Sequence, residues 1–557
     1  MVIRLALGGA AGLTFGLWVL PWELVTGSGA FWQLLDSDRA ASLIGYLYFV
    51  ADDWRWPLYA IGTLQLPEGT SVVFTDSVPL IALLMKVLRT FGMPPWNYFG
   101  AWLLACYVLN GVAMALVLWC AGVRSSTLTL LAALLAAGMP VLLHRWYHLA
   151  LCGQFLILLS FACYVAVARA RRPEAVLGAA ALLVLVSLGV HPYLWAMVFA
   201  LYVATLARAG RTRVPWRRTV YHLALTCLVL AVLMLALGYV SLAGPLGAAG
   251  EGYGYFSANL LSPFVSSLSG LSVHAWEWLR VAEAEGSAWP FYSSARPDAT
   301  GGQFYEGFGY VGLGLLALCA LHVPHVIRNG AYLVRQHWPL LGVLVGAVLF
   351  AVSNRAYVGD HLVAAIPIPS MLAALAGVFR SSGRFLWIVA YAALVGATVL
   401  TARRFGTRGG AGILALALVL QLLDAAPLRQ AIALDARSTH TAGLSLPEWK
   451  HWFSAGFDRL YIVPSYPCGD PHLGNRKLAL QYIAARVGPI PTNSASTARP
   501  RRECGDEMRL LDDATDGVRT TWVFFADGLR HPEVERFTRS SDTMCRFVGE
   551  ALACMRQ

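Results

Sequence analysis

Long apolar segments, separated by short polar ones, fill the first three quarters of the chain. Almost no ionisable residue stands in the middle of these segments, and an α-helix needs about 20 apolar residues to cross a bilayer. The pattern therefore predicts an α-helical polytopic membrane protein with about 11 transmembrane helices. The predicted spans are residues 2–20, 98–120, 127–143, 155–168, 175–190, 194–208, 220–240, 308–321, 339–353, 385–401 and 411–423.

The first of these segments begins with a single cation, Arg4, and stays apolar to Leu20. A cleaved signal peptide would end in a clean small-residue cleavage site, but here small residues are scattered along the segment. We therefore expect an uncleaved first span, with a cleaved signal peptide as the alternative.

The composition agrees with a membrane protein and changes the interpretation of the net charge. Of 557 residues, 57% are hydrophobic and 13% are charged, whereas a soluble domain carries about 25% charged residues. The net charge of +11 would suit a nucleic-acid partner. The arginines, however, gather in short loops between apolar segments, as the positive-inside rule expects, so we expect no nucleic acid as partner.

Alternate loops are basic, and this alternation orients the predicted spans. The basic loops contain Arg124, 168–174, 208–218, 325–337 and 402–410, and the positive-inside rule places them in the cytoplasm. Nearly all acids of the membrane half lie in the intervening loops, which are therefore expected to face outward. An odd number of spans leaves the rest of the chain outside as well.

The last part of the chain has a different composition. Charges and prolines become more frequent, and YIVP (461–464) and TTWVFFA (520–526) are typical of short β-strands. The sequence thus predicts a transmembrane domain over residues 1–423 and a small soluble α/β domain over residues 424–557.

An even set of cysteines lies in this soluble domain: Cys468, Cys504, Cys545 and Cys554. Disulfides persist in oxidising compartments, which fits an outward location. Four cysteines allow three pairings, of which we favour Cys468–Cys504 with Cys545–Cys554. A zinc site is the alternative, although no C-x-x-C spacing supports it.

The first outer loop, residues 21–97, is far longer than a turn. Within it, residues 42–56 and 77–91 have helical, amphipathic patterns but are too short or too charged to cross a membrane comfortably. We expect both helices to lie in the outer interface with their apolar faces toward the membrane lipids. If 77–91 crossed the membrane instead, every later loop would change side.

This arrangement resembles the GT-C superfamily of membrane glycosyltransferases, whose members have a first span, a long outer loop with an acidic motif, and a soluble C-terminal domain. Asp36-Ser37-Asp38-Arg39 stands where their loop acid stands. A closer resemblance, to a bacterial multi-spanning family of unassigned function, implies the inner membrane with the C-terminal domain in the periplasm. It rests on EGTSVVFTDSVPLIALL (68–84), GFGYVGLG (307–314), IPIPSMLAALAGVFRSSGRFLW (366–387) and YIVPSYPCG (461–469).

The GT-C resemblance implies an inverting glycosyltransferase that moves a sugar from a polyprenyl-phosphate-linked donor to a glycan, lipid or protein acceptor. Such a reaction needs a carboxylate to take the acceptor's proton and fixed cations at the departing phosphate. Asp38 is the expected base, with Asp36 as its partner or alternate. No cofactor is firmly indicated, although two carboxylates at this spacing also suit a divalent cation. The noncatalytic alternative is that Asp36 caps the following helix.

The expected donor-phosphate contacts are Arg380 and Arg384 of the segment FRSSGRF, together with Arg39 and His148. Arginine on the outer side runs against the positive-inside trend, and a lipid phosphate would compensate for it. In a helix, residues 380 and 384 would project to one side, and Gly383 would permit a close backbone approach. The alternative is that these arginines reach phospholipid headgroups as ordinary interfacial residues.

Further polar residues on the outer side are predicted to line the substrate cavity. Asp76 either caps the second interfacial helix or faces the cavity, and His148 could be an ordinary interfacial histidine. GT-C enzymes often carry an acid in the second outer loop, whereas HRWYHLALCGQ (144–154) has none, which weakens a two-acid or metal-bound mechanism. The predicted cavity residues are Asp76, Gln154, His191, Tyr193, Glu306, Asp360 and His361.

Two other classes of function compete with sugar transfer. A flippase or transporter of lipid-linked sugars would place charged residues inside its spans, where this chain has almost none. A noncatalytic envelope-glycan assembly factor would use the periplasmic domain as a binding module. The sugar, the acceptor and the linkage depend on the shape of the cavity, so the sequence leaves them open.

Overall fold

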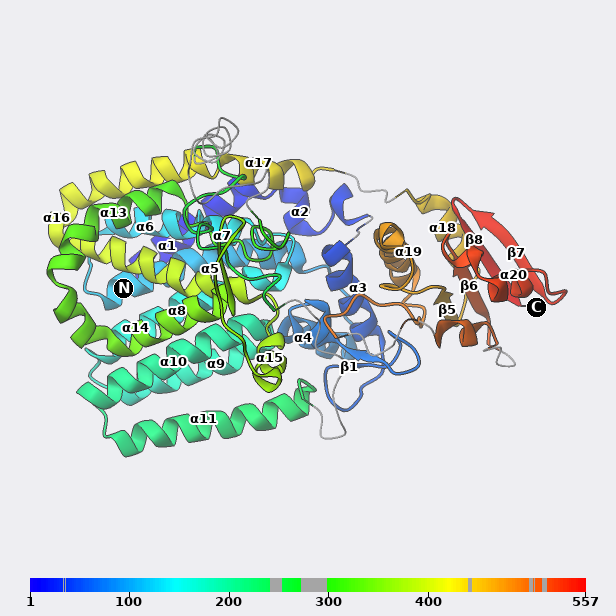
Figure 1. Cartoon of the computed structure of the whole chain (residues 1–557), viewed down its shortest axis with the longest axis horizontal. Coiled ribbons are helices and arrows are strands. Elements are labelled where there is room, and N and C mark those ends of the chain that lie inside the picture. Colours follow the sequence, from blue (N-terminus) through cyan, green and yellow to red (C-terminus); the bar gives the residue numbers. More distant parts are fainter. Residues whose placement is uncertain are drawn as a thin grey trace.

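A computed structural model describes residues 1–33, 35, 37–240, 253–271, 298–438, 443–499, 504, 506–512 and 518–556. Figure 1 shows a bundle of long helices at one end of the molecule and the C-terminal domain at the other. Helices α3 (Ser37–Ala51) and α4 (Pro79–Thr90) of the first outer loop lie between these two parts.

Helices occupy every predicted span. Among the described residues, eight helices are long and apolar enough to cross a membrane, and Ser126–Ala137 and Leu313–Arg328 are shorter apolar helices. The bundle helices are α1 (Val2–Val19), α5 (Phe99–Cys120), α6 (Ser126–Ala137), α7 (Pro140–Leu143), α8 (Phe155–Val167), α9 (Pro173–Val190), α10 (Pro192–Thr212), α11 (Trp216–Leu237), α13 (Leu313–Arg328), α14 (Gly330–Val352) and α16 (Leu386–Asp424).

Helix α16 contains both of the last two predicted spans and corrects the loop expected at 402–410. Its residues are helical except at Gly406, whose backbone has a φ of 64°. A Cβ built on Gly410 would lie 3.4 Å from the carbonyl oxygen of Thr401, so the chain reverses direction at Gly406. Glycine adopts this left-handed conformation without a steric penalty. A turn at this single residue therefore replaces the longer loop that the sequence predicted.

The five loops predicted to be cytoplasmic lie at one end of the bundle and contact one another. Arg169 and Arg403 both donate to the carbonyl oxygen of Ala121, at 2.9 and 3.1 Å. Arg211 donates to the carbonyl oxygen of Arg335 at 3.2 Å. The N-terminus and the reversal in α16 lie at this same end of the molecule (Figure 1).

The first outer loop folds into helices and a short hairpin. Its elements are α2 (Trp22–Thr26), α3, β1 (Ala60–Ile61), β2 (Thr70–Ser71) and α4. The first interfacial helix begins earlier than expected, at Ser37 rather than residue 42, and ends at Ala51. Helix α4 has 12 residues, too few for a span, and its exposed side carries Leu80, Leu84 and Val87.

The C-terminal domain contains the predicted strands and disulfides. Its sheet has the order β5-β6-β8-β7, with a parallel β5–β6 pair and antiparallel neighbours elsewhere. The disulfides Cys468–Cys504 and Cys545–Cys554 form as favoured from the sequence. Its elements are α18 (Leu446–Phe453), β5 (Arg459–Ile462), α19 (Gly474–Val487), β6 (Thr520–Phe524), α20 (Pro532–Thr538), β7 (Thr543–Val548) and β8 (Ala551–Arg556). Helix α17 (Ala426–Asp435) lies within the range predicted for this domain but packs on α1, α7 and α16 of the bundle.

The C-terminal domain packs on the first outer loop through backbone hydrogen bonds as well as apolar contacts. Leu66 N donates to Thr492 O at 2.8 Å, and Thr492 N donates to Thr63 O at 3.0 Å. Ala498 N donates to Phe74 O at 2.8 Å. One hydrophobic core runs from the bundle through α3 into α19. The bundle and the C-terminal domain therefore share a continuous core.

The remaining elements are short. A hairpin of β3 (Arg355–Val358) and β4 (His361–Ala365) and the helix α15 (Ser370–Gly377) lie between α14 and α16. The 3₁₀ helices are η1 (Ala30–Trp32), η2 (Val72–Thr75), η3 (Leu149–Cys152), η4 (Ser382–Phe385), η5 (Pro471–Leu473), η6 (Asp506–Leu511) and η7 (Gly528–Arg530).

Candidate functional site

Charged side chains from six segments meet where the first outer loop covers the bundle. Glu306, just before α13, is at the centre and is buried. Its Oε2 lies 3.0 Å from Arg145 Nη1 and accepts from Arg384 Nε at 3.0 Å, while its Oε1 lies 2.9 Å from His148 Nε2. Arg145 also donates to the backbone oxygen of Glu306 at 2.6 Å. We call this group, together with Asp38, Asp76 and His191, the acid–histidine cluster.

His148 lies among three carboxylates of this cluster, and at least one of them faces each of its ring nitrogens. Besides Glu306, Asp38 Oδ2 lies 3.6 Å from Nε2, and Asp76 Oδ2 lies 3.6 Å from Nδ1. Of these three contacts only the one with Glu306 is a hydrogen bond, and Nδ1 has no hydrogen-bond partner; the other two carboxylates favour the charged ring through their negative charge. Burial acts to lower the pKa of His148, but Glu306, Asp76 and Asp38 outweigh burial and raise this pKa to about 9.

The cations of the cluster keep the buried Glu306 and the half-buried Asp76 ionised. Burial acts to raise the pKa of Glu306, but Arg384, Arg145 and His148 together hold it well below its usual range. Burial acts in the same direction on Asp76, where His191 and His148 outweigh it and lower the pKa. The cluster is therefore a compensated set of charges at neutral pH.

The raised pKa of His148 predicts a pH-dependent stability. The pKa in the folded chain, about 9, lies above the ordinary value of about 6.5. Protonation of His148 thus stabilises the fold fully below about pH 6.5, and this contribution is lost as the pH rises through 9. We expect the unfolding temperature in detergent to fall more steeply between about pH 7 and 9.5 for the wild type than for His148→Gln. Equal slopes in thermal melts would contradict the charged state of His148.

Asp38 is the exposed member of the cluster. It stands in the first turn of α3, and half of its side chain, 50%, is accessible to solvent. Asp36 lies outside the described residues. Asp38 is thus the solvent-accessible carboxylate of the cluster, 3.6 Å from the buried His148.

Asp76 faces the cluster and does not cap α4, whose preceding residue is Val78. Asp76 Oδ1 lies 2.8 Å from His191 Nε2. His191 Nδ1 in turn accepts from Tyr193 N at 3.1 Å, at the start of α10. The ring of Tyr193 lies 4.6 Å from the guanidinium of Arg384, so these predicted cavity residues do lie together.

The close approach expected at Gly383 brings Arg384 to Glu306. A Cβ on Gly383 would lie 2.5 Å from Gly307 Cα and 3.0 Å from Ala258 N, so no side chain fits there. Gly383 and Gly307 each stand directly beside a charged residue of the ion pair. Two glycines in contact therefore set the distance between the two charged side chains.

This contact makes Gly383→Ala a sensitive substitution. The added methyl group overpacks the contact with Gly307, and we expect a loss of about 1–3 kcal/mol in the free energy of unfolding. Thermal or denaturant unfolding in detergent would measure it. Gly377→Ala is the matched control, because a Cβ at Gly377 meets no atom within 4 Å; a similar loss in both variants would contradict the contact.

Arg380 and Arg39 lie away from the cluster. Helix α15 ends at Gly377, so Arg380 and Arg384 do not share one helical face. Arg380 is exposed, with its guanidinium 6.0 Å from the ring of Phe256. Arg39 pairs with Asp435 of α17 at 2.7 Å, which occupies the guanidinium expected to hold a phosphate.

Three other predicted cavity residues also lie apart from the cluster. Gln154 is buried among the bundle helices, where it accepts from the hydroxyl of Tyr391 at 2.9 Å and donates to the carbonyl oxygen of Val141 at 3.0 Å. Asp360 and His361 pair with each other at 2.6 Å on the β3–β4 hairpin. The structure thus divides the predicted cavity residues into a cluster and two separate groups.

Sequence reasoning missed the role of Arg145. This residue is fully buried and donates to Glu306 from a turn between α7 and η3. One feature of the sequence could have indicated this role. Arg145 lies in a loop predicted to face outward, where the positive-inside rule expects few cations. Within the part of the chain that the structure describes, no group of three or more His, Cys, Asp or Glu side chains is arranged to hold a metal ion.

The chain is similar to one known family. A family model described as a domain of unknown function, DUF6311, matches residues 9–426, which include every member of the acid–histidine cluster. No curated protein matches the chain.

Proposed function

Because this chain belongs to the DUF6311 family of domains of unknown function, whose description assigns no activity, we propose its function from its own site. We propose an inverting glycosyltransferase that moves a sugar from a polyprenyl-phosphate donor to an extracytoplasmic glycan, lipid or protein. The observation that carries this proposal is Asp38, a half-exposed carboxylate held above the buried His148. A carboxylate so placed suits a general base that works at a surface where lipid-linked substrates arrive.

The proposed topology has eleven helices crossing the bacterial inner membrane. It counts α16 as two crossings joined at Gly406 and includes the short helices α6 and α13. The meeting of the basic loops at one end of the bundle supports a cytoplasmic location for that end. The acid–histidine cluster and the C-terminal domain would then lie on the periplasmic side.

In the proposed reaction, the acceptor hydroxyl oxygen attacks the anomeric carbon of the donor sugar. Asp38 takes the hydroxyl proton while the bond from the anomeric carbon to the phosphate oxygen breaks, and polyprenyl phosphate leaves with the bonding electron pair. A single displacement inverts the anomeric configuration. His148 orients Asp38 and holds it near the donor. Arg380 is the proposed contact for the leaving phosphate, since it is exposed and forms no ion pair with any described residue.

Arg384 and Arg145 serve this proposal indirectly, as positioning residues. Both are buried and both form ion pairs with Glu306. They therefore fix the position of the carboxylate that His148 contacts. The same pairing favours a second candidate, a noncatalytic envelope-assembly factor. A fully compensated cluster ties the outer loops to the bundle whether or not a reaction takes place above it.

A reconstituted transfer assay tests the proposal. The purified full chain in liposomes would be mixed with radiolabelled polyprenyl-phosphate sugars and a membrane glycolipid extract, with and without EDTA. We expect a labelled product whose anomeric configuration is opposite to that of the donor, and loss of product with EDTA would assign a divalent cation. If no donor is consumed, the transferase proposal fails; a lipid-scrambling assay on the same liposomes then tests the flippase alternative.

A further inference from the structure

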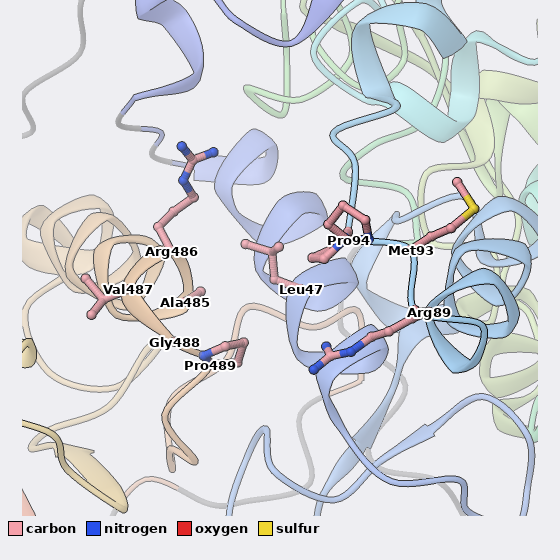
Figure 2. A pocket seen from close by; sticks show the side chains of 11 residues that line it. Leu47, Arg89, Met93, Pro94, Ala485, Arg486, Val487, Gly488 and Pro489 are labelled. Carbon is pink, nitrogen blue, oxygen red and sulfur yellow. The ribbon is translucent and has the colours of Figure 1, made fainter.

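A cleft of about 690 Å³ lies between the first outer loop and the C-terminal domain, and no member of the acid–histidine cluster lines it. Figure 2 shows Arg89 and Met93 on one side, Arg486 and Val487 on the other, and Leu47 of α3 between them. The two sides come from parts of the chain that are almost 400 residues apart. The cleft therefore exists only in the assembled protein.

Helix α3 holds both walls of this cleft in place. The hydroxyl of Tyr46 donates to the carbonyl oxygen of Trp96 at 2.9 Å, which fixes the first wall. The hydroxyl of Tyr48 donates to the carbonyl oxygen of Ile490 at 2.5 Å, which fixes the second wall. Leu47, between the two tyrosines, lines the cleft. The cleft is thus formed before any ligand binds, which lowers the free-energy penalty of binding.

The charge of the cleft is positive and uncompensated. Arg89 and Arg486 are exposed, and neither forms an ion pair with a described residue; no acid is among the lining residues. Each arginine stands in the last turn of its helix, where a cation also offsets the helix dipole. That role explains a cation on each helix, but it does not require both cations to line one cleft.

Exposed apolar side chains lie in the lining and next to it along the chain. Phe91, Met93 and Trp96 are 80%, 52% and 50% exposed, and Pro94 and Pro95 line the cleft between them. Exposed aromatic and apolar side chains beside arginines are typical of a segment at the membrane interface. A ligand matched to this surface has an anionic head and an apolar chain.

We propose that this cleft binds the phosphate of an anionic membrane phospholipid. The headgroup contacts Arg89, whose side chain reaches into the cleft (Figure 2), and an acyl chain lies over Phe91 and Met93. The Arg486 side chain points away from Arg89 in Figure 2, next to Tyr482, and joins the headgroup by rotating its exposed side chain. A bound lipid would fasten the C-terminal domain to the first outer loop at the membrane surface. The proposal goes beyond sugar transfer and holds whether or not the chain is an enzyme.

Thermal melting of the full chain in nonionic detergent tests this proposal. Phosphatidylglycerol would be titrated into the wild type and into Arg89→Gln/Arg486→Gln, with phosphatidylcholine and inorganic phosphate as separate arms. We expect phosphatidylglycerol to raise the unfolding temperature of the wild type, and its apparent dissociation constant to rise at least about tenfold in the double variant. Arg536→Gln/Arg539→Gln, which removes two exposed arginines of α20, should bind like the wild type.

Further variants and ligands decide whether the two arginines and an anionic lipid are responsible for the binding. Arg89→Lys/Arg486→Lys keeps both charges and should retain phosphatidylglycerol binding. If the double glutamine variant does not fold, the single variant Arg89→Gln replaces it and should also weaken phosphatidylglycerol binding. Equal phosphatidylglycerol binding by the wild type and the glutamine variant would overturn the proposal. An equal effect of phosphatidylcholine, or of inorganic phosphate alone, would overturn the assignment to an anionic lipid.

Discussion

Asp38→Asn should slow the proposed sugar transfer by about 10²- to 10⁴-fold, the contribution typical of a positioned general base. The amide keeps the size of the side chain and its place in the first turn of α3, but it cannot take a proton from the acceptor hydroxyl. Because the side chain is half exposed, at 50%, the unfolding temperature should change little. The rate of label transfer in liposomes, measured beside a thermal melt, separates the two effects.

Asp53→Asn is the matched control for this experiment. Asp53 is an exposed acid of the same outer loop and lies outside the acid–histidine cluster, so its loss should leave the transfer rate within about twofold. Retention of full activity in Asp38→Asn would refute Asp38 as the base. Loss of activity together with a large fall in unfolding temperature would assign Asp38 to the fold rather than to the reaction.

The second large effect is expected at Glu306. Glu306→Gln removes the carboxylate that both Arg145 and Arg384 contact, and it leaves two buried cations without a counter-charge. Breaking a buried ion pair by removing one partner costs about 3–5 kcal/mol. We expect the variant to unfold at a markedly lower temperature or denaturant concentration, and to be recovered in lower yield from membranes.

A surface pair provides the comparison for this stability measurement. Glu174→Gln breaks the exposed Glu174–Arg218 pair and should cost at most about 1 kcal/mol. Adding Arg145→Met to Glu306→Gln should restore part of the lost stability, because one of the two uncompensated cations is then absent. If the double variant is less stable than Glu306→Gln, the charge argument for this cluster is wrong.

The elements that the sequence predicts well are those set by local patterns. Runs of apolar residues gave the helices of the bundle, short β-rich runs gave strands β5 and β6, and the cysteines formed the favoured pairs. The loop expected at 402–410 was wrong because a single glycine, Gly406, reverses the chain inside α16. Hydropathy shows where a helix is polar, but it does not show where the backbone turns.

The candidate site was predicted only in part, since its contacts join residues far apart along the chain. Asp38, Asp76, His148 and Glu306 were each named from their outward position. No local pattern indicated that three carboxylates would converge on one histidine. The partner of Arg39 is likewise remote, at Asp435. Spacing within one segment cannot reveal which distant segment neutralises a charge.

The backbone hydrogen bonds between the first outer loop and residues 492–498 imply an order of biosynthesis. Leu66 and Phe74 are made early, but their partners Thr492 and Ala498 leave the ribosome only after the whole bundle has been synthesised. Until then these groups of the first loop are without their native partners. The loop that carries Asp38 and Asp76 therefore reaches its final form last, when the C-terminal domain has been synthesised and has docked.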